Sequence, residues 1–402
     1  MSHRTFRLNI REYIKTNRIL YTISQFNSHS NIYLVGGGVR DLLLHRSVLD
    51  IDIVFETLDY KFLDYLTDVF KVESIIKSPF LTWKISIGDI EIDLAHTRGE
   101  YYREPGALPE TYPVHSIYQD LKRRDFTINS IACILTPNTG DIVDPMDGYH
   151  DLKEGILRVL KAGSFLEDPT RAFRAIRYKN RFGFIYHPLT EEEFEHAKKL
   201  MSRISASRVR NELERISVEE NRKEMFREIG LKKLLFHWRD FFNTFREDML
   251  VSLHEYLDFE KDTWFYFLLV YTRDIEALGG CGLLERKERR SLERILALDR
   301  IEKEIMPEEL HRWFRKFSDD EVLAAGALQG LKKEILRKYL LRRKDVRVLH
   351  DAEEIKEMGI PASRLNEILT ILEIEKMKGK LRSKREEEQF LRVLKSRHTF
   401  LP

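Results

Sequence analysis

The sequence predicts an α/β domain over residues 1–148 and an all-α remainder over residues 149–402. Short apolar or alternating runs, separated by glycine-containing turns, fill the first part and are typical of β-strands. After Pro145–Gly148 the apolar residues recur at helical spacing to the end of the chain. This change of pattern places the main boundary near residue 148.

The N-terminal part is predicted to be a sheet of four or five strands with helices packed beside it. Residues 83–87 and 90–94 alternate around Gly88-Asp89, which is the pattern of a β-hairpin. The predicted strands are residues 31–35, 49–55, 83–87 and 90–94 and a segment near 142–143, and the predicted helices are residues 39–44 and 62–70.

The remainder is divided by turn signals. Helical spacing covers residues 165–182, 190–201, 207–217 and 221–229, and apolar and aromatic residues then recur through 234–275. Basic helices are predicted from there to the end. Gly279-Gly280 and Gly359–Pro361 are the expected breaks.

Composition excludes several classes of protein. The sequence contains no run of 18 apolar residues and no apolar signal segment near its start, so we expect a cytoplasmic protein with no membrane partner. Its two cysteines, Cys133 and Cys281, exclude a disulfide scaffold and a cysteine-rich zinc site. The net charge of +2 hides an asymmetry, because residues 331–402 carry 19 basic and 12 acidic residues. A basic tail joined to an acidic remainder suits an enzyme that holds metal ions and a polyanion in different places, although solvated helical surfaces explain it equally well.

Three carboxylates are candidate metal ligands. Residues i and i+2 of a strand share a face, so Asp50 and Asp52 project together while Ile51 and Ile53 point into the core. If the hairpin strand lies beside them, Asp93 joins the pair and completes a hard-oxygen site for Mg²⁺. Two such ions clamp an in-line phosphoryl transfer. Taken alone, an Asp-x-Asp is more often a surface strand, and glycosyltransferases also use this motif.

Gly36, Gly37 and Gly38 stand between a predicted strand and a predicted helix, shortly before Asp50. Glycines in that position let backbone N–H groups approach a phosphate, and Arg40 is placed to help with triphosphate oxygens. A tight turn is the simpler explanation of the glycines alone. The run fits neither a dinucleotide fingerprint nor a P-loop, because the third glycine of the one and the Gly-Lys of the other are absent.

Five motifs, in this order, resemble the class II CCA-adding enzymes and bacterial poly(A) polymerases of the polymerase β-like nucleotidyltransferase superfamily. They are Leu34–Leu44 with Asp50–Ile53, then Asp120–Ala132, then Asp144–Gly148 with Ile156–Arg158, then Glu167–Arg177 with Phe182–Phe184, and finally Ile204–Leu213. The resemblance implies a catalytic head (residues 1–148), a base-recognising neck (149–220), a helical body (221–330) and a basic tail that binds tRNA (331–402).

The resemblance also implies roles for matching residues. Asp50, Asp52 and Asp93 hold two Mg²⁺ ions, and the substrates are ATP, CTP or both. Arg124 and Asp125 contact the sugar, while Arg123 and Asn129 support that region or the phosphates. Asp168 and Arg171 read the incoming base. Gly36, Gly37 and Arg40 complete the nucleotide site.

The base-reading role can be checked against the chemistry of the bases. Cytosine and adenine each offer an amino group beside a ring acceptor, which a carboxylate and a guanidinium match, whereas guanine and uracil offer the reverse polarity. At positions i and i+3 of one helix, Asp168 and Arg171 share a face, as an ordinary ion pair also would. Arg174 and Arg177 continue that face, where they either hold the triphosphate or pair with Glu167. Arg208 and Glu212 form an i,i+4 pair, either a buttress of the base-reading helix or a surface salt bridge.

The expected RNA partner is the acceptor and TΨC arm of tRNA, which a protein binds mainly through phosphates. The candidate contacts in the tail are Lys332, Lys333, Arg337, Lys338, Arg342, Arg343, Lys376, Lys380 and Arg382. Solvated helix faces are the alternative for each. We expect a monomer or a weak dimer.

Several activities share these motifs: full CCA addition, CC-only or A-only addition, and poly(A) addition. Asp168–Arg171, Phe182–Phe184 and Pro105–Pro109 look more like the branch that includes A-adding enzymes, and a large helical body and tail favour tRNA over general RNA. A metal-dependent glycosyltransferase and a non-catalytic RNA-binding protein are the rivals from other classes. The first needs neither the Arg123–Asp125 block nor Asp168 with Arg171, and the second does not need the carboxylates.

Overall fold

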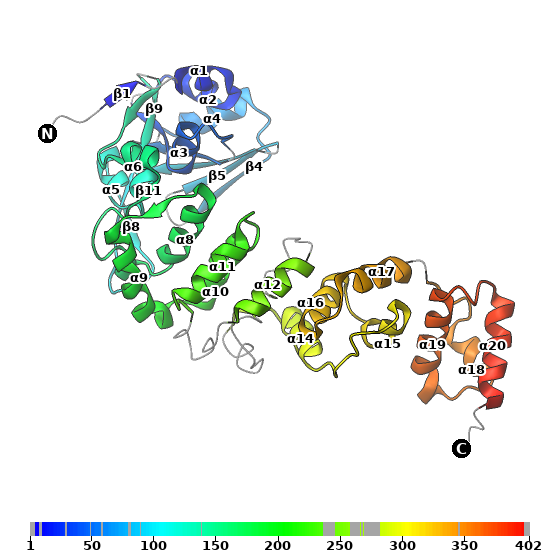
Figure 1. The fold of residues 1–402 in the computed structure, drawn as a ribbon. Helices are drawn as coiled ribbons and strands as arrows, with labels where there is room; N and C mark the ends of the chain where they lie inside the picture. The colour runs from blue at the N-terminus through cyan, green and yellow to red at the C-terminus, as the bar shows by residue number, and fades with distance from the viewer. Residues whose placement is uncertain are drawn as a thin grey trace. The chain divides into compact units, whose positions relative to one another are not determined.

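The computed structural model describes residues 5–7, 10–28, 30–48, 50–57, 59–78, 82–88, 90–137, 139–235, 246–257, 266, 268, 282–344 and 346–397. The expected break at Gly279-Gly280, the residues Asp89 and Cys281 and most of segment 234–275 lie outside these residues. The chain forms two compact units, residues 1–242 and 243–402 (Figure 1). The four-part division into head, neck, body and tail stays a prediction.

An eight-stranded mixed sheet is the centre of the first unit, with strand order β1-β10-β9-β2-β3-β6-β5-β4. Its only parallel pair, within the described part of the chain, is β3 with β6. The strands are β1 (Thr5–Arg7), β2 (Ile32–Val35), β3 (Ile51–Phe55), β4 (Ser74–Ser78), β5 (Thr82–Ile87), β6 (Ile90–His96), β9 (Ala132–Thr136) and β10 (Asp141–Val143). A separate antiparallel ribbon joins β7 (Arg98–Tyr101) and β8 (Glu110–Pro113).

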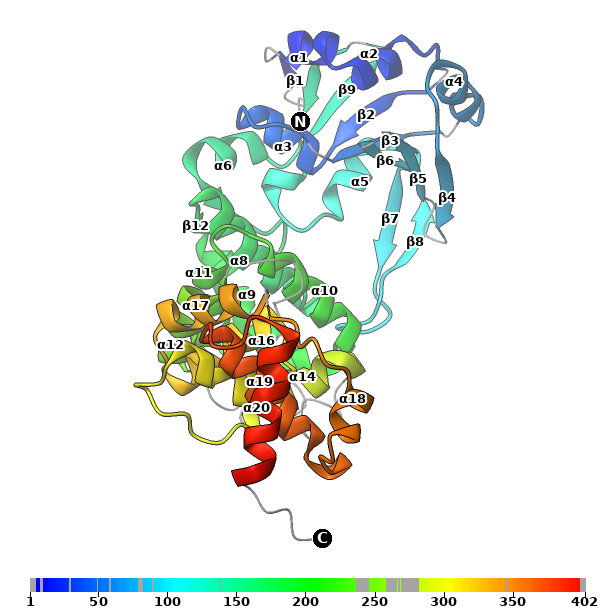
Figure 2. The same cartoon turned by 90° about the vertical axis from the view of Figure 1, so that its right-hand side faces the viewer.

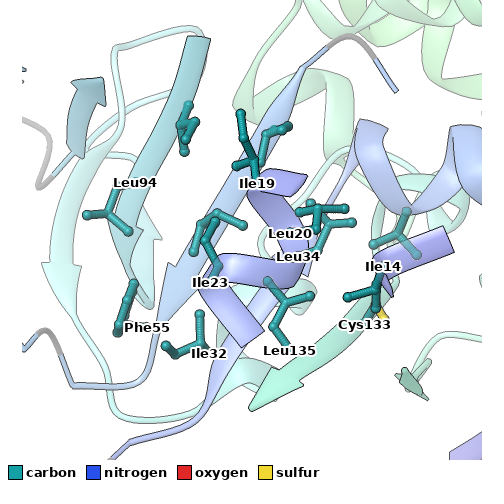
Figure 3. Packing of buried hydrophobic residues seen from close by; sticks show 14 of the residues in the cluster. Ile14, Ile19, Leu20, Ile23, Ile32, Leu34, Phe55, Leu94, Cys133 and Leu135 are labelled. Carbon is teal, nitrogen blue, oxygen red and sulfur yellow. The ribbon is translucent and has the colours of Figure 1, made fainter. Parts of the chain in front are cut away.

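One face of this sheet carries the main core. Ile51, Ile53 and Phe55 alternate on β3 and are almost fully buried there. Helices α1 (Ile10–Thr16), α2 (Arg18–Gln25), α3 (Gly37–Leu43) and α4 (Lys61–Val69) contribute side chains to the same cluster. Figure 3 shows the side chains of α2 lying over the strands. The opposite face carries a smaller cluster, which is completed by α5 (Ile117–Lys122).

The expectation of four or five strands was too low. The hairpin β5–β6 and the strands at residues 32–35, 51–55 and 141–143 are confirmed. The missed strands are β1, β4 and β9. β4 lies at the sheet edge with its isoleucines exposed, so it shows no alternation of buried and exposed residues. β9 lies between β2 and β10 and is mostly buried, so it has no alternating polar face either.

The rest of the first unit is largely helical. Its elements are η1 (Thr127–Asn129), α6 (Gly148–Glu154), β11 (Ile156–Leu157), α7 (Ser164–Glu167), α8 (Arg171–Phe182), β12 (Ile185–Tyr186), α9 (Pro188–Leu200), η2 (Met201–Arg203), α10 (Ala206–Ser217) and α11 (Arg222–Leu231). In Figure 2 the β7–β8 ribbon extends from the sheet toward α10. The connection between its strands is held there, because Gly106 N–H donates to the Leu166 carbonyl at 3.1 Å and the Gly106 carbonyl accepts from Arg208 Nη1 at 2.8 Å.

The single helix predicted over residues 165–182 is wrong. The structure has two helices, α7 and α8, with Asp168 between them in an extended conformation (φ −134°, ψ 97°). Pro169 explains the break, because a residue that precedes proline is disfavoured in the helical region. Asp168 and Arg171 therefore do not share a helix face as the i, i+3 argument assumed.

The second unit is helical in its described residues. Its elements are α12 (Glu247–Tyr256), α14 (Arg286–Leu296), η4 (Pro307–Leu310), α15 (His311–Phe314), α16 (Asp319–Gln329), α17 (Lys333–Lys344), α18 (Ala352–Glu357), η5 (Ala362–Arg364), α19 (Leu365–Met377) and α20 (Lys384–Arg397). Helices α18, α19 and α20 enclose a small apolar cluster of their own. Across the described residues, no helix has the length and apolarity that a membrane crossing requires.

Candidate active site

Two of the predicted carboxylates are neighbours across the parallel strands. Asp52 of β3 and Asp93 of β6 are register partners, so both side chains leave the same face of the sheet. This is the face that α5 covers further along the strands, since Val54 and Ala95 lie two residues beyond. Asp50 is exposed and comes immediately before β3. The strand that carries Asp93 thus lies beside the strand of Asp52, which was the condition for Asp93 to join this site.

All three carboxylates line one pocket of about 1040 Å³. Every other residue predicted for nucleotide binding lines it as well: Gly36, Gly37, Arg40, Arg124, Asp125, Asn129, Asp168, Arg171, Arg174 and Arg177. The structure therefore gathers residues that span 142 positions of the sequence into one cavity. Asp52 and Asp93 line it from the sheet, and Arg171, Arg174 and Arg177 line it from α8.

The carboxylates disfavour one another's ionisation. Burial, together with the charges of Asp93 and Asp50, raises the pKa of Asp52 to about 6, although Arg124 and Arg40 act in the opposite sense. Partial burial likewise raises the pKa of Asp93, and the Lys84 ammonium opposes this rise. A bound cation would remove the repulsion and favour the ionised forms of Asp52 and Asp93.

The donor set fits a hard cation, because carboxylate oxygens are the ligands that Mg²⁺ prefers. Within the described ranges, however, no three Asp, Glu, His or Cys side chains are already gathered at metal-binding distance. Asp52 and Asp93 provide the adjacent pair, and Asp50 borders the same pocket. The two-ion site stays a prediction.

Gly36 lies between β2 and α3, has a positive φ of 66° and lies against the acidic group. A Cβ at this position would come within 2.8 Å of Arg124 Nη1 and 3.4 Å of Asp52 Oδ2. Glycine is therefore required both for the backbone conformation and for the close approach. The helix that follows begins at Gly37, two residues earlier than predicted.

Arg40 is built into the pocket wall. Its side chain is 4% exposed, Nη1 donates to Asn129 Oδ1 at 2.7 Å, and Nε donates to Asp41 at 2.9 Å. The guanidinium also lies over the rings of Tyr178 and Phe182, at 5.1 and 4.7 Å from their centroids. These contacts join α3 to α8, so Arg40 connects the two walls of the pocket as well as bordering it.

The Arg123–Asp125 block is held by buried acids. Asp120 is fully buried and accepts from Arg123 Nη2 at 2.8 Å and from Arg124 Nη2 at 3.0 Å. The two guanidinium groups keep the pKa of Asp120 low against the effect of burial. Arg124 Nε is buried without a hydrogen-bond partner among the described residues. The Arg124 side chain also lines the pocket.

Asp125 joins the sheet domain to α8. Its carboxylate accepts from Arg174 Nε at 2.7 Å and from Asn129 Nδ2 at 3.0 Å. The Arg174 guanidinium helps to hold the pKa of Asp125 low despite complete burial. Arg174 thus pairs with Asp125 rather than with Glu167, which pairs with Lys161. Arg177 is 8% exposed, and its Nε has no hydrogen-bond partner within the described structure.

The predicted base readers meet at the pocket although they are not on one helix face. Asp168 Oδ1 accepts from Thr170 N at 2.9 Å, from Thr170 Oγ1 at 2.6 Å and from Arg208 Nη2 at 2.6 Å. Arg171 lies in the first turn of α8 and is 5% exposed. Among the described residues no hydrogen bond to Asp168 Oδ2 is found, and the Asp168 side chain lines the pocket.

Arg208 and Glu212 do not form the predicted i,i+4 pair. Arg208 reaches Asp168 and the Gly106 carbonyl, while Glu212 accepts from Arg215 at 3.1 Å. Arg208 binds Asp168 in preference to Glu212, because this contact gives a hydrogen-bond partner to a partly buried carboxylate outside the helix of Arg208. Arg208 therefore holds Asp168, the predicted base reader, and its role as a buttress of base reading stays a prediction.

Sequence reasoning missed Lys84, Arg98, Glu100 and Tyr102, all of which line the pocket. Lys84 is the register partner of Asp93 and pairs with Glu91 at 2.7 Å. The register of the predicted hairpin places Lys84 opposite Asp93, so this neighbour could have been predicted from the sequence. Tyr102 gave no signal, because its role depends on contacts with residues far along the chain.

The predicted RNA contacts in the second unit divide into two groups. Lys332, Arg337, Lys338, Arg342, Lys380 and Arg382 are exposed, and of these Arg342 also pairs with the buried Glu308. Lys333, Arg343 and Lys376 are partly buried and engaged: Lys333 bonds the Glu255 carbonyl, Arg343 pairs with Asp319, and Lys376 pairs with the fully buried Glu387. Lys376 is only 10% exposed, so the geometry assigns it to the packing of α19 against α20 and argues against an RNA contact.

A mixed sheet that presents paired carboxylates to an arginine-lined pocket defines a nucleotidyltransferase. Comparison with known proteins narrows the class. Residues 32–158 match the family model of the poly(A) polymerase head domain. The CCA-adding enzyme of Streptococcus pneumoniae is 30% identical over 88% of this chain and 91% of its own length. The A-adding tRNA nucleotidyltransferase of Halalkalibacterium halodurans is 28% identical over 90% of this chain and 88% of its own length.

The chain belongs to the family of CCA-adding and A-adding tRNA nucleotidyltransferases. The fold agrees, since the Thermotoga maritima CCA-adding enzyme, solved in complex with tRNA, superposes with a TM-score of 0.77 at 25% identity, over 98% of this chain and all of that one. Other A-adding relatives, from Geobacter sulfurreducens and Aquifex aeolicus, are longer proteins, of which this chain spans 30% and 44%.

Proposed function

We propose that this protein adds nucleotides from CTP, ATP or both to the 3′ end of tRNA. The observation that carries the proposal is the position of Asp52 and Asp93, which face a pocket shared with Asp168 and Arg171. The first pair supports chemistry on phosphate, and the second supports selection of a base without a nucleic-acid template. A glycosyltransferase accounts for the first pair only.

In the reaction, the RNA 3′-hydroxyl attacks the α-phosphorus of the triphosphate. A new phosphate ester bond forms, the bond to the β-phosphate breaks, and pyrophosphate leaves. Asp50, Asp52 and Asp93 would hold two Mg²⁺ ions, which supply charge neutralisation and activate the hydroxyl. Arg124 and Arg177, whose side chains line the pocket, bind the triphosphate or sugar.

Asp168 and Arg171 are the base readers in this proposal. The free oxygen of Asp168 accepts from the amino group of cytosine or adenine, and Arg171 donates to the adjacent ring nitrogen. Uracil and guanine would face these groups with like polarity, which is costly in a buried site. Arg208 and Thr170 fix the carboxylate by occupying its other oxygen.

The test uses four RNAs: tRNAs ending before CCA, after C and after CC, and an unstructured RNA of similar length. Each is incubated with labelled CTP or ATP and Mg²⁺. Incorporation of C and A, of C alone or of A alone into tRNA identifies the activity. The matching head-domain model is named for poly(A) polymerases, so repeated addition of A to the unstructured RNA would favour that activity. No incorporation into any RNA would refute the proposal.

A further inference from the structure

The Arg171 guanidinium is held from three sides. Nη1 donates to Ser164 Oγ at 2.8 Å, and Nη2 donates to the Arg123 carbonyl at 3.2 Å and to the Tyr102 hydroxyl at 3.3 Å. These partners come from α7, from the end of α5 and from the end of the β7–β8 ribbon. The planar group is thereby fixed in orientation and in place.

The Tyr102 hydroxyl has a defined direction in this network. An arginine only donates and a carboxylate only accepts, so the hydroxyl accepts from Arg171 and donates to Glu100, 3.4 Å away. Glu100 in turn pairs with Arg123, whose carbonyl binds Arg171. The result is a closed circuit of hydrogen bonds around one side of Arg171.

Among the residues of this circuit, Tyr102 is the one whose hydrogen bond to Arg171 can be removed with the least effect on other contacts. Ser164 and Arg123 make other contacts in the wall, and Arg123 also anchors Asp120. The Tyr102 hydroxyl contacts Arg171 and Glu100, and it lies in the pocket beside Asp168. Its loss would leave Arg171 Nη2 with the Arg123 carbonyl, while Nη1 keeps Ser164 Oγ and lies 3.7 Å from Glu167. The guanidinium would then be held on one side less.

We infer that Tyr102 is a positioning residue for base selection, whose hydroxyl holds Arg171 in the orientation that faces the incoming base. The inference rests on the proposed role of Arg171 as a base reader. Discrimination by polarity requires the donor to stay in place, because a mobile guanidinium can turn away from a mismatched base and avoid the unfavourable contact. Tyr102 therefore affects selectivity through Arg171 and does not contact the reacting atoms.

The experiment compares Tyr102→Phe with the wild-type protein in equilibrium binding of ATP, CTP, UTP and GTP, measured without tRNA. Loss of one hydrogen bond should lower the preference for ATP and CTP over UTP and GTP by about fivefold. Tyr186→Phe is the matched control, because the Tyr186 hydroxyl bonds Glu228 at 2.8 Å outside this pocket. That control should keep the wild-type preference.

A second comparison separates positioning from a general structural effect. In an Arg171→Lys background the phenylalanine substitution at position 102 should have no further effect on the preference, since its partner is already altered. Equal losses in both backgrounds, or an unchanged preference in Tyr102→Phe, would overturn the inference. A wild-type protein that prefers ATP and CTP in binding but incorporates neither into any RNA would refute the proposed reaction and leave this test of Tyr102 valid.

Discussion

Asp52 of β3 and Asp93 of β6 are register partners on adjacent parallel strands, and their carboxylates leave the same face of the sheet. Backbone pairing thus fixes two like charges side by side before any ligand arrives. Such an arrangement is unfavourable for folding alone, since each charge disfavours the other. A cation bound between the two carboxylates would relieve this repulsion.

Replacement of Asp52 by Asn should greatly slow transfer while tRNA binding persists. The amide keeps the shape of the side chain but removes a charge that the triphosphate and cation require, so the transfer rate should fall by at least roughly a hundredfold. Incorporation of labelled nucleotide measures the rate, and filter binding measures affinity for tRNA. Asp64→Asn, at an exposed position of α4, is the control and should change neither. Parallel loss of both in Asp52→Asn would argue against a role confined to the reaction.

The stability of the metal-free protein should depend on Asp52 and on pH. Its pKa of about 6 lies above the ordinary value of 3.8, so the folded state binds more protons than the unfolded state between these values. Stability should therefore fall as pH rises from about 4 through 6, by about 2 kcal/mol from this group. Urea unfolding in EDTA at several pH values measures the change. Asp52→Asn should lack this component, and a slope identical to wild type would contradict the pKa.

Lys84 should weaken Mg²⁺ binding in the wild-type protein. It is the register partner of Asp93, and its ammonium interacts favourably with Asp93 and Asp50, both candidate ligands. Lys84→Met removes a competing positive charge, so Mg²⁺ should bind more tightly by roughly three- to tenfold at low salt. Calorimetric titration of the metal-free protein measures this affinity. Lys61→Met at the start of α4 provides a control charge change, and weaker binding in Lys84→Met would contradict the expectation.

Asp168→Ala should reduce discrimination between bases. The substitution removes the acceptor for the amino group of cytosine and adenine, and it leaves Arg208 without one of its partners. We expect kcat/KM for ATP and CTP to fall by about tenfold or more, with a smaller effect on UTP and GTP. Single-nucleotide incorporation assays with each triphosphate give the ratio. Unchanged selectivity and rate would exclude Asp168 as a base reader.

The sequence predicted the local features of the site well. The alternation on residues 50–53 and in the hairpin at residues 83–94 correctly predicted which face of its own strand each of Asp52 and Asp93 occupies. Their meeting was conditional on the two strands being neighbours, and the parallel pairing of β3 with β6 meets that condition. The prediction failed where a neighbour in space or a local steric effect decides the outcome. Pro169 breaks the helix that was expected to carry Asp168, and Arg208 bonds Asp168 across two helices rather than Glu212 on its own helix. Periodicity within one segment contains no information on such long-range contacts.

Burial separates two lysines that look alike in the sequence. Lys376 pairs with the fully buried Glu387, which also accepts from His350, whereas Lys380 is 64% exposed. Lys376→Met should lower the free energy of unfolding by about 3 kcal/mol, because it leaves a buried carboxylate without its cation. Lys380→Met should leave stability nearly unchanged, weaken tRNA binding and reduce its salt dependence by about one counterion. Urea unfolding and salt-dependent tRNA binding measure the two effects. Weaker tRNA binding with unchanged stability in Lys376→Met would instead indicate that Lys376 contacts RNA.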